Sequence, residues 1–174
     1  AEAWQSRRAY PLVVTQGDGN LGVKGKNFEM LFSIAGAGPA SLKVNGTEWL
    51  WRAPRPAFWR ASTDNDRGCG FPLRAAAWMA ADVFVTYSGM KVLEAGPDCV
   101  KVQFQFGIPT VPGASAELVY TVEAQGALRV DAVYHGVAGA PELPCFGVKF
   151  ETFGPVTRTV WTGLSGETYP DRYK

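Results

Sequence analysis

The densest group of side chains that could perform chemistry is the run Asp64-Asn65-Asp66-Arg67-Gly68. Two carboxylates this close could act as acid and base in glycoside hydrolysis, which uses a pair about 5 to 10 Å apart. Such a pair needs an apolar pocket that raises one pKa, and the neighbouring residues do not predict one. A calcium loop is disfavoured because Gly68 stands where the EF-hand pattern requires an oxygen ligand. The run therefore predicts a polar loop whose Asp and Asn side chains bond to nearby backbone.

The residues that follow this run favour movement. Gly68 and Gly70 can absorb changes of backbone conformation at little steric cost, and Pro72 marks a further bend. We expect this stretch to be able to move as a lid over a neighbouring site.

Other reactive side chains stand alone in the sequence. The single histidine, His135, lies in a predicted strand beside a glycine, and no serine or cysteine has a recognisable activating motif. Cys69, Cys99 and Cys145 are odd in number and far apart, which disfavours both a disulfide framework and a zinc site. We expect no metal site in this chain, and free cysteines favour a reducing cytoplasm.

Charge and length exclude several classes of function. Lys and Arg number 17 against 16 Asp and Glu, so the net charge of +1 provides no long-range attraction to nucleic acid or anionic lipid. No apolar stretch approaches the roughly 20 residues that span a bilayer. With 174 residues and 47% hydrophobic content, the chain predicts one soluble globular domain.

Six tryptophans are many for this length, and flat aromatic faces suit sugar rings. Trp49 and Trp51, however, stand two residues apart and so share one face of a predicted strand. The more common outcome of that spacing is burial, so we expect these two side chains in the core.

The elements that must position these residues are mostly strands, because apolar and polar residues alternate along much of the chain. Two hairpins are predicted, one joining 83–94 to 99–107 and one joining 117–122 to 128–134. Asn45-Gly46 is read as a two-residue hairpin turn rather than as a glycosylation site. Further strands are expected at 12–15, 28–34, 41–44, 48–51, 146–152 and 157–162. The one predicted helix covers 73–82, where alanines follow Pro72.

About ten short strands, separated by turns every 8 to 12 residues, indicate an all-β sandwich or barrel. No linker divides the chain, so a single domain is predicted.

Two segments resemble a known family. Arg60-Ala61-Ser62-Thr63-Asp64-Asn65-Asp66-Arg67-Gly68 resembles the Arg-Ala-Pro-Thr/Leu-Asp-Asn-Asp-x-Gly signature of the last domain of large bacterial β-galactosidases, in glycoside hydrolase family two. Trp161-Thr162-Gly163-Leu164-Ser165-Gly166-Glu167-Thr168-Tyr169-Pro170-Asp171-Arg172 resembles the Gly-x-Gly-Pro-x-Glu-x-Tyr-x-Asp-Arg signature of that domain. The resemblance covers nearly the whole chain from Tyr10. Ser62 departs from the usual Pro, and Ser165-Gly166 and Thr168 depart from the usual Gly-Pro and Asn.

The resemblance implies an antiparallel β-sandwich that forms the N-terminal part of a galactose-mutarotase-like supersandwich, the small-chain domain or domain five of the family. Residues 1–9 would be a linker or an artificial remainder, and 10–174 the domain itself, truncated at its C-terminus. Exposed strand edges would then allow copies to pair as a homo-oligomer.

The resemblance also implies a function. Catalysis in the retaining parent enzyme belongs to glutamates of a separate catalytic barrel domain, which also holds magnesium and sodium, so this chain alone is expected to be inactive and to need no cofactor. It would wall the galactoside cleft and supply a lid. Its lid loop would be Gly68, Cys69, Gly70, Phe71 and Pro72, and its structural motif residues Arg60, Asp64, Asn65, Asp66, Tyr169, Asp171 and Arg172.

Two other functions are weighed against this one. A free-standing carbohydrate-binding β-sandwich would bind sugars through exposed tryptophans. A mutarotase would need a histidine and carboxylate set on the concave face of the sheet, for which His135 alone is too few.

Overall fold

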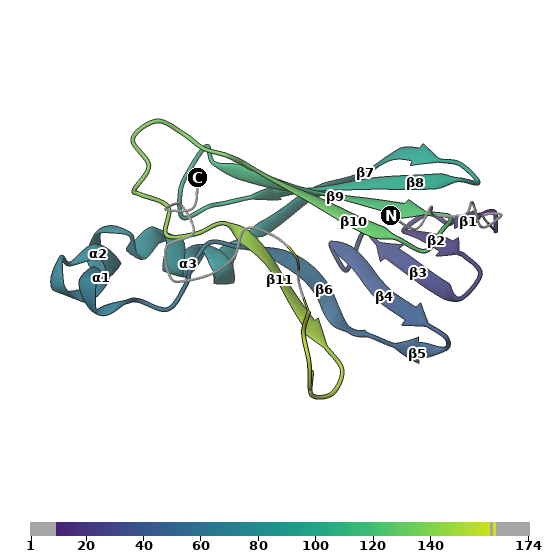
Figure 1. The fold of residues 1–174 in the computed structure, drawn as a ribbon. Coiled ribbons are helices and arrows are strands. Elements are labelled where there is room, and N and C mark those ends of the chain that lie inside the picture. The colour runs from purple at the N-terminus through teal and green to yellow at the C-terminus, as the bar shows by residue number, and fades with distance from the viewer. Residues whose placement is uncertain (1–9, 161, 163–174) are drawn as a thin grey trace.

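The computed structural model describes residues 10–160 and residue 162, most of which lie in antiparallel β-strands (Figure 1). The strands of this part are β1 (Val13–Gln16), β2 (Asn20–Lys24), β3 (Phe28–Ser33), β4 (Gly38–Val44), β5 (Thr47–Glu48), β6 (Leu50–Ala57), β7 (Thr86–Ala95), β8 (Cys99–Gly107), β9 (Ser115–Glu123), β10 (Leu128–His135) and β11 (Gly147–Thr152). Its helices, which separate β6 from β7, are α1 (Asp64–Gly68), α2 (Phe71–Arg74) and α3 (Ala76–Phe84). The chain is therefore all-β with one helical insertion.

The strands form three sheets. One has the order β1-β2-β3-β4-β5, a second the order β10-β9-β8-β7, and β6 pairs with β11 in the third. All neighbouring pairs are antiparallel and most join strands consecutive in the chain, but β6 and β11 lie far apart in sequence. That long-range pair ends close to the helical insertion (Figure 1).

The main core lies between the first two sheets, which confirms the predicted sandwich. Phe32 of the five-stranded sheet stacks on Phe104 of the four-stranded sheet, with ring centroids 6.1 Å apart. The side chains buried around this pair are Leu12, Leu21, Val23, Met30, Ala37, Val100, Val102, Phe106, Leu118, Tyr120, Val122 and Ala124. Burial of each large apolar side chain stabilises the fold by about 1.5 to 3 kcal/mol.

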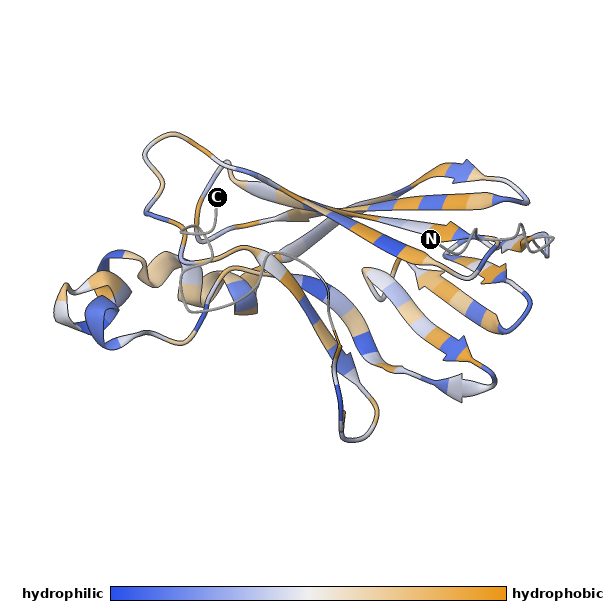
Figure 2. Cartoon of the chain, in the orientation of Figure 1, coloured by the Kyte–Doolittle hydropathy of each residue, from blue (hydrophilic) through white to orange (hydrophobic). Residues whose placement is uncertain are grey.

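The alternating pattern along β8 is confirmed. Val100, Val102, Phe104 and Phe106 are all buried, while the residues between them are less buried or exposed. Figure 2 shows the same alternation of hydrophobic and hydrophilic residues along the strands of this sheet. Both predicted hairpins are present, as the β7–β8 and β9–β10 pairs.

The turn between β4 and β5 is also confirmed. Asn45 and Gly46 have φ values of 51° and 80°, the left-handed conformations that a tight two-residue hairpin turn requires.

Some predicted boundaries were wrong. The strand expected over 83–94 begins only at Thr86, because α3 continues to Phe84. Trp78 and Ala81, three residues apart on one side of α3, are both fully buried, so packing extends the helix beyond Asp82. The single helix expected over 73–82 is instead divided into α2 and α3.

Two further differences concern strands. The strand expected at 157–162 does not form over 157–160 or at 162, where the exposed Val156 and Val160 find no sheet to cover among the described residues. Conversely, β2 was not predicted, because it is short and contains Gly22, a residue type that is rare in strands, although Leu21 and Val23 are both buried on one face. Pairing with β1 and β3 on either side holds this strand in the sheet.

Over the part of the chain that the structure describes, no helix combines the length and apolar character needed to cross a membrane.

Candidate functional site

The Asp64–Asp66 run does not form the expected loop but starts the short helix α1. Thr63 is the N-cap, and its hydroxyl accepts a hydrogen bond from the Asp66 amide at 3.2 Å. The Asp66 carboxylate in turn accepts from the Thr63 amide at 2.8 Å. This reciprocal capping box satisfies two amide groups at the helix start and explains why a polar run adopts helical structure.

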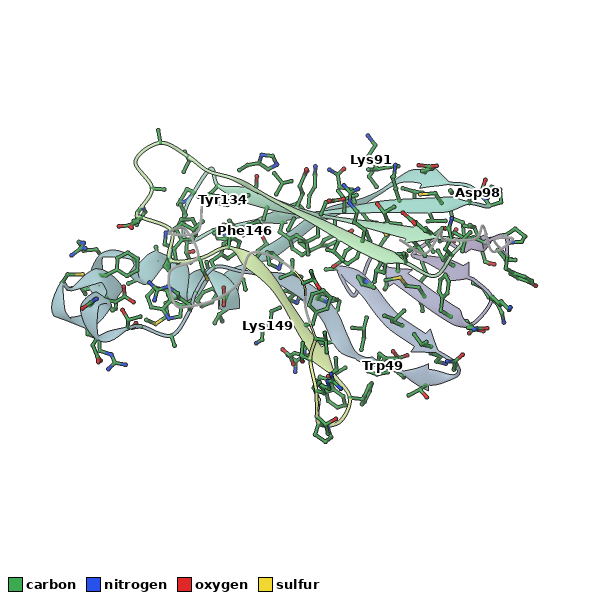
Figure 3. All side chains as sticks on the ribbon, in the orientation of Figure 1. Trp49, Lys91, Asp98, Tyr134, Phe146 and Lys149 are labelled. Atoms are coloured by element: carbon green, nitrogen blue, oxygen red, sulfur yellow. The ribbon has the colours of Figure 1, made fainter. Side chains whose placement is uncertain are left out.

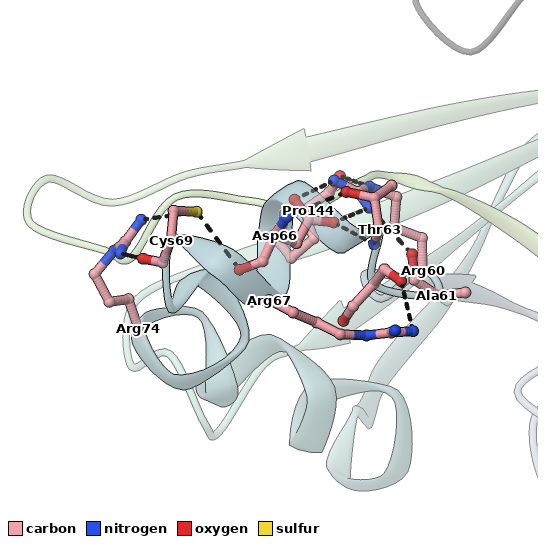
Figure 4. A network of polar contacts seen from close by, with 9 residues as sticks. Arg60, Ala61, Thr63, Asp66, Arg67, Cys69, Arg74 and Pro144 are labelled. Carbon is pink, nitrogen blue, oxygen red and sulfur yellow. Dashed lines mark hydrogen bonds and ion pairs between the residues drawn. The ribbon is translucent and has the colours of Figure 1, made fainter.

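Arg60 joins this helix start to the segment that precedes β11 (Figure 4). Its guanidinium donates to both carboxylate oxygens of Asp66, at 2.6 Å and 3.2 Å, and its Nε donates to the carbonyl of Pro144 at 3.3 Å. The hydrogen bond from Arg60 is the main reason that the pKa of Asp66 lies well below its usual range. Asp66 is therefore an ionised, fully engaged carboxylate.

Asp64 and Asn65 have different surroundings from Asp66. The side chain of Asp64 is 100% exposed and pairs with Arg67 at 3.2 Å, whereas that of Asp66 is only 15% exposed. Asn65 accepts a hydrogen bond from the Cys69 amide through its backbone carbonyl. The two carboxylates thus do not share a pocket in which one could hold a proton.

The expected lid loop spans the end of α1, a turn and the start of α2. Gly68 ends α1, Cys69 is exposed, and Gly70 turns the chain with a φ of 67° before Phe71 and Pro72 open α2. Phe71 is buried in the cluster described next, so this segment is anchored at one point. The Arg74 guanidinium donates to the Cys69 carbonyl across the turn (Figure 4).

A second apolar cluster lies beneath the helices. The ring of Phe58 is fully buried and lies 5.7 Å from that of Trp78, 6.3 Å from Tyr134 and 5.8 Å from Phe146. Figure 3 labels Tyr134 on β10 and Phe146 just before β11, on the side of the molecule that carries the helices. The Asp82 carboxylate accepts from the Phe58 amide at 2.7 Å, which ties α3 to the end of β6.

The expectation that Trp49 and Trp51 are core residues was wrong. Their exposed fractions are 50% and 57%, and Trp51 contacts the exposed Phe153 edge to face at 4.9 Å. Trp49 lies between β5 and β6 (Figure 3), and Trp51 is the second residue of β6, at the end where Leu50 pairs with Thr152 of β11. Beside Trp49 lies a cavity of about 340 Å³ lined by Met30, Pro39, Leu42, Val44, Leu50, Pro54, Tyr120, Leu128, Phe150 and Thr152. Sequence reasoning missed this cavity because its walls come from six separate strands.

The remaining candidates behave as isolated side chains. His135 is the last residue of β10, and its Nε2 lies 3.8 Å from a carboxylate oxygen of Glu117. The three cysteines are free thiols. Among the described residues no group of three or more His, Cys, Asp or Glu side chains could hold a metal ion. Tyr169, Asp171 and Arg172 lie outside the described residues.

Neutralising Asp66 is expected to loosen α1. Asp66→Asn removes the ion pair with Arg60, so we expect faster amide hydrogen exchange over residues 63–70 at pH 7. Because the pKa of Asp66 is lowered in the folded chain, its stabilising effect is complete above the unfolded-state value of about 3.9 and decreases as the pH falls below it. The difference between the two proteins should therefore shrink at pH 3.

Asp64→Asn is the matched control, since it removes the same charge from the same helix at a fully exposed position. Equal effects of the two substitutions at pH 7 would show that net charge, and not the Arg60–Asp66 pair, determines the stability of α1.

Comparison with known proteins gives consistent matches over most of the chain. A family model described as beta galactosidase small chain matches residues 24–174. The chain is 44% identical over 180 residues to the β-galactosidase small subunit of Latilactobacillus sakei, covering 92% of this chain and 57% of that subunit. It is 36% identical over 160 residues to a β-galactosidase of Clostridium acetobutylicum, covering 91% of this chain and 18% of that protein.

A β-galactosidase of Lactobacillus delbrueckii subsp. bulgaricus is 38% identical over 156 residues, which cover 89% of this chain and 15% of that protein. The chain thus spans 57% of the small-subunit relative and less than a fifth of the two longer ones. The match over 24–174, together with the all-β sandwich around Arg60–Gly68, shows that this chain belongs to the β-galactosidase small chain family.

Proposed function

We propose that this chain is a non-catalytic part of a β-galactosidase and lines the cleft in which terminal β-D-galactosides are hydrolysed. The observation that carries the proposal is the family match over residues 24–174, which includes the Arg60–Gly68 motif. The relative from Latilactobacillus sakei is named a small subunit, and a small subunit works with another chain. The reaction itself then belongs to a catalytic barrel outside this chain.

The geometry of the two motif carboxylates supports a non-catalytic role. A retaining glycosidase needs one carboxyl group with a raised pKa and a second, ionised one nearby. Asp66 has the opposite shift and is held by Arg60 and Thr63, and Asp64 is open to solvent. Their duty is to fix the start of α1, which places residues 68–72 beside the substrate.

The helical insertion carries the surface that we assign to the partner. Leu73 of α2 is 84% exposed, and Val83 and Phe84 at the end of α3 are also exposed. Large apolar side chains gain about 1.5 to 3 kcal/mol each when a partner removes them from water. A catalytic barrel domain that packed here would lie directly beside α1 and the proposed lid.

The magnesium and sodium ions of the parent enzyme belong, in this proposal, to that barrel. In the described part of this chain, no three His, Cys, Asp or Glu side chains gather in a group that could hold a metal ion. Separately, β7 and β10 are the outer strands of their sheet, so strand pairing between copies is the contact that we propose for a homo-oligomer.

Co-expression with the catalytic polypeptide of a two-chain β-galactosidase tests the proposal. We expect the two chains to copurify and to hydrolyse nitrophenyl β-D-galactoside. The catalytic chain alone should be slower by on the order of 10²-fold, as expected when a cleft wall that positions the substrate is missing, and this chain alone should show no hydrolysis. Hydrolysis by this chain alone, lost in Asp66→Asn, would contradict it. Stable copurification without any gain in activity would also count against the assigned cleft role.

The exposed tryptophans favour a second candidate function, a carbohydrate-binding module. Trp49 and Trp51 are each about half exposed at one end of the β6–β11 pair, where their rings could contact a sugar. Calorimetric titration of the chain with galactose and lactose separates the two proposals. Sugar binding with a dissociation constant of millimolar or lower, lost in Trp51→Ala, would favour the carbohydrate-binding module. If titration produces no heat of binding, the proposal that this chain is a part of a β-galactosidase is favoured.

A further inference from the structure

The segment between β10 and β11, residues 136–146, contacts the motif although more than 60 residues separate the two in sequence. This β10–β11 connection contains neither helix nor strand. Its residues Ala140, Leu143 and Phe146 pack against the cluster of Phe58 and Trp78. The connection and the helical insertion therefore share one apolar core.

Two side-chain hydrogen bonds join the connection to the insertion through backbone carbonyls. The indole Nε1 of Trp78 donates to the carbonyl of Pro141 at 3.0 Å, and Nε of Arg60 donates to that of Pro144 at 3.3 Å. Carbonyls in an irregular segment lack the partners that a helix or sheet would provide, so such bonds determine where the segment lies.

The Arg60 guanidinium contacts both the β10–β11 connection and the start of α1. One side of its fork donates to Asp66, which closes the capping box of α1, and its Nε donates to the connection at Pro144 (Figure 4). Because the guanidinium is planar and rigid, a displacement of Pro144 changes the geometry of the bonds to Asp66 as well. Cys145 also lies here, where burial and the nearby Asp82 carboxylate raise the pKa of its thiol.

We propose that the β10–β11 connection is a positioning element for the motif segment, residues 60–74. It acts through the Pro144 and Pro141 carbonyls on Arg60 and Trp78, and thereby sets the position of α1 and of the proposed lid. The effect of this positioning on substrate binding rests on the proposed function. The coupling between the β10–β11 connection and residues 60–74 does not depend on it.

Gly139 offers a way to disturb the connection without touching the motif. Its φ is 81°, and a Cβ added there would meet nothing within 4 Å, so Gly139→Ala introduces backbone strain without a clash. Gly154 is the matched control, because its φ is 74° and its surroundings are equally open, but it lies after β11. Both variants carry the strain of a left-handed alanine.

Amide hydrogen exchange of the isolated chain tests the coupling. We expect Gly139→Ala to speed exchange over residues 64–74 by about fivefold, the size of effect that strain of this kind produces, and Gly154→Ala to leave it unchanged. Trp78→Phe, which deletes the indole N–H but keeps an aromatic ring, should in return speed exchange at Ala140, Glu142 and Leu143, the residues of 140–144 that carry an amide hydrogen. Equal exchange of 64–74 in the two glycine variants would overturn the proposal.

A kinetic measurement separates positioning from simple stabilisation. In the assembled β-galactosidase, Gly139→Ala should raise KM about threefold with little change in kcat, as expected when a binding surface moves, and Gly154→Ala should change neither. Unchanged KM in Gly139→Ala, despite faster exchange, would overturn the positioning role. If no active assembly forms, the proposed function fails, and the exchange experiment still decides the coupling.

Discussion

Replacing Phe58 with alanine is expected to lower the free energy of unfolding by about 3 to 5 kcal/mol, the usual cost of truncating a buried Phe. Phe58 has no exposed surface, and its ring contacts three other aromatic rings that come from α3, β10 and the β10–β11 connection. Its removal leaves a cavity at the point where all three meet. Urea denaturation followed by tryptophan fluorescence measures the change.

Phe153→Ala is the control for this substitution. Phe153 is also an aromatic residue with a ring partner, Trp51, but half of its surface is already exposed. Its truncation should cost less than about 1 kcal/mol. Similar losses in both variants would mean that the second apolar cluster contributes little to global stability.

Replacing Tyr120 with phenylalanine is expected to stabilise the chain by about 1 to 3 kcal/mol, the cost of a buried hydroxyl without a partner. Tyr120 is fully buried between Phe32 and Phe104, and its hydroxyl has no hydrogen-bond partner among the described residues. Burial also raises the pKa of this phenol, which keeps it neutral. The midpoint of urea denaturation should therefore increase.

Tyr87→Phe provides the comparison, because Tyr87 packs against Phe104 and Phe106 from a half-buried position where water can reach it. We expect its substitution to change the unfolding free energy by less than about 0.5 kcal/mol. A loss of stability in Tyr120→Phe would show that the hydroxyl has a partner, such as an ordered water in the adjoining cavity.

The strands were predictable where one face is buried and where the paired strand follows closely in the sequence. Alternation identified β8, and Asn45-Gly46 identified a turn, because both signals arise from a few consecutive residues. The exposure of Trp49 and Trp51 was not predictable in this way. Two residues on one strand face are buried only if another layer covers that face, and no layer is specified by their spacing.

The candidate site was predictable in its residue types but not in its structure. Thr63 and Asp66 form a capping box in which Asp takes the place that Glu or Gln usually has, so the local signal for α1 was weak. The contacts of Arg60 with Pro144, and of Trp78 with Pro141, depend on chain reversal through four strands. Such long-range contacts are determined by the order and pairing of the strands, and no pattern in the neighbouring residues indicates them.

The bond from Arg60 to Pro144, which spans 84 residues, has a consequence for the order of folding. The helical insertion emerges from the ribosome before β7 to β10, but its aromatic cluster stays incomplete until Tyr134 and Phe146 have been made. At about 5 to 20 residues per second, the N-terminal strands have several seconds to pair before that point. The motif segment can form its capping box early, but its contacts with the β10–β11 connection are among the last to form, because loop closure over this distance must come first.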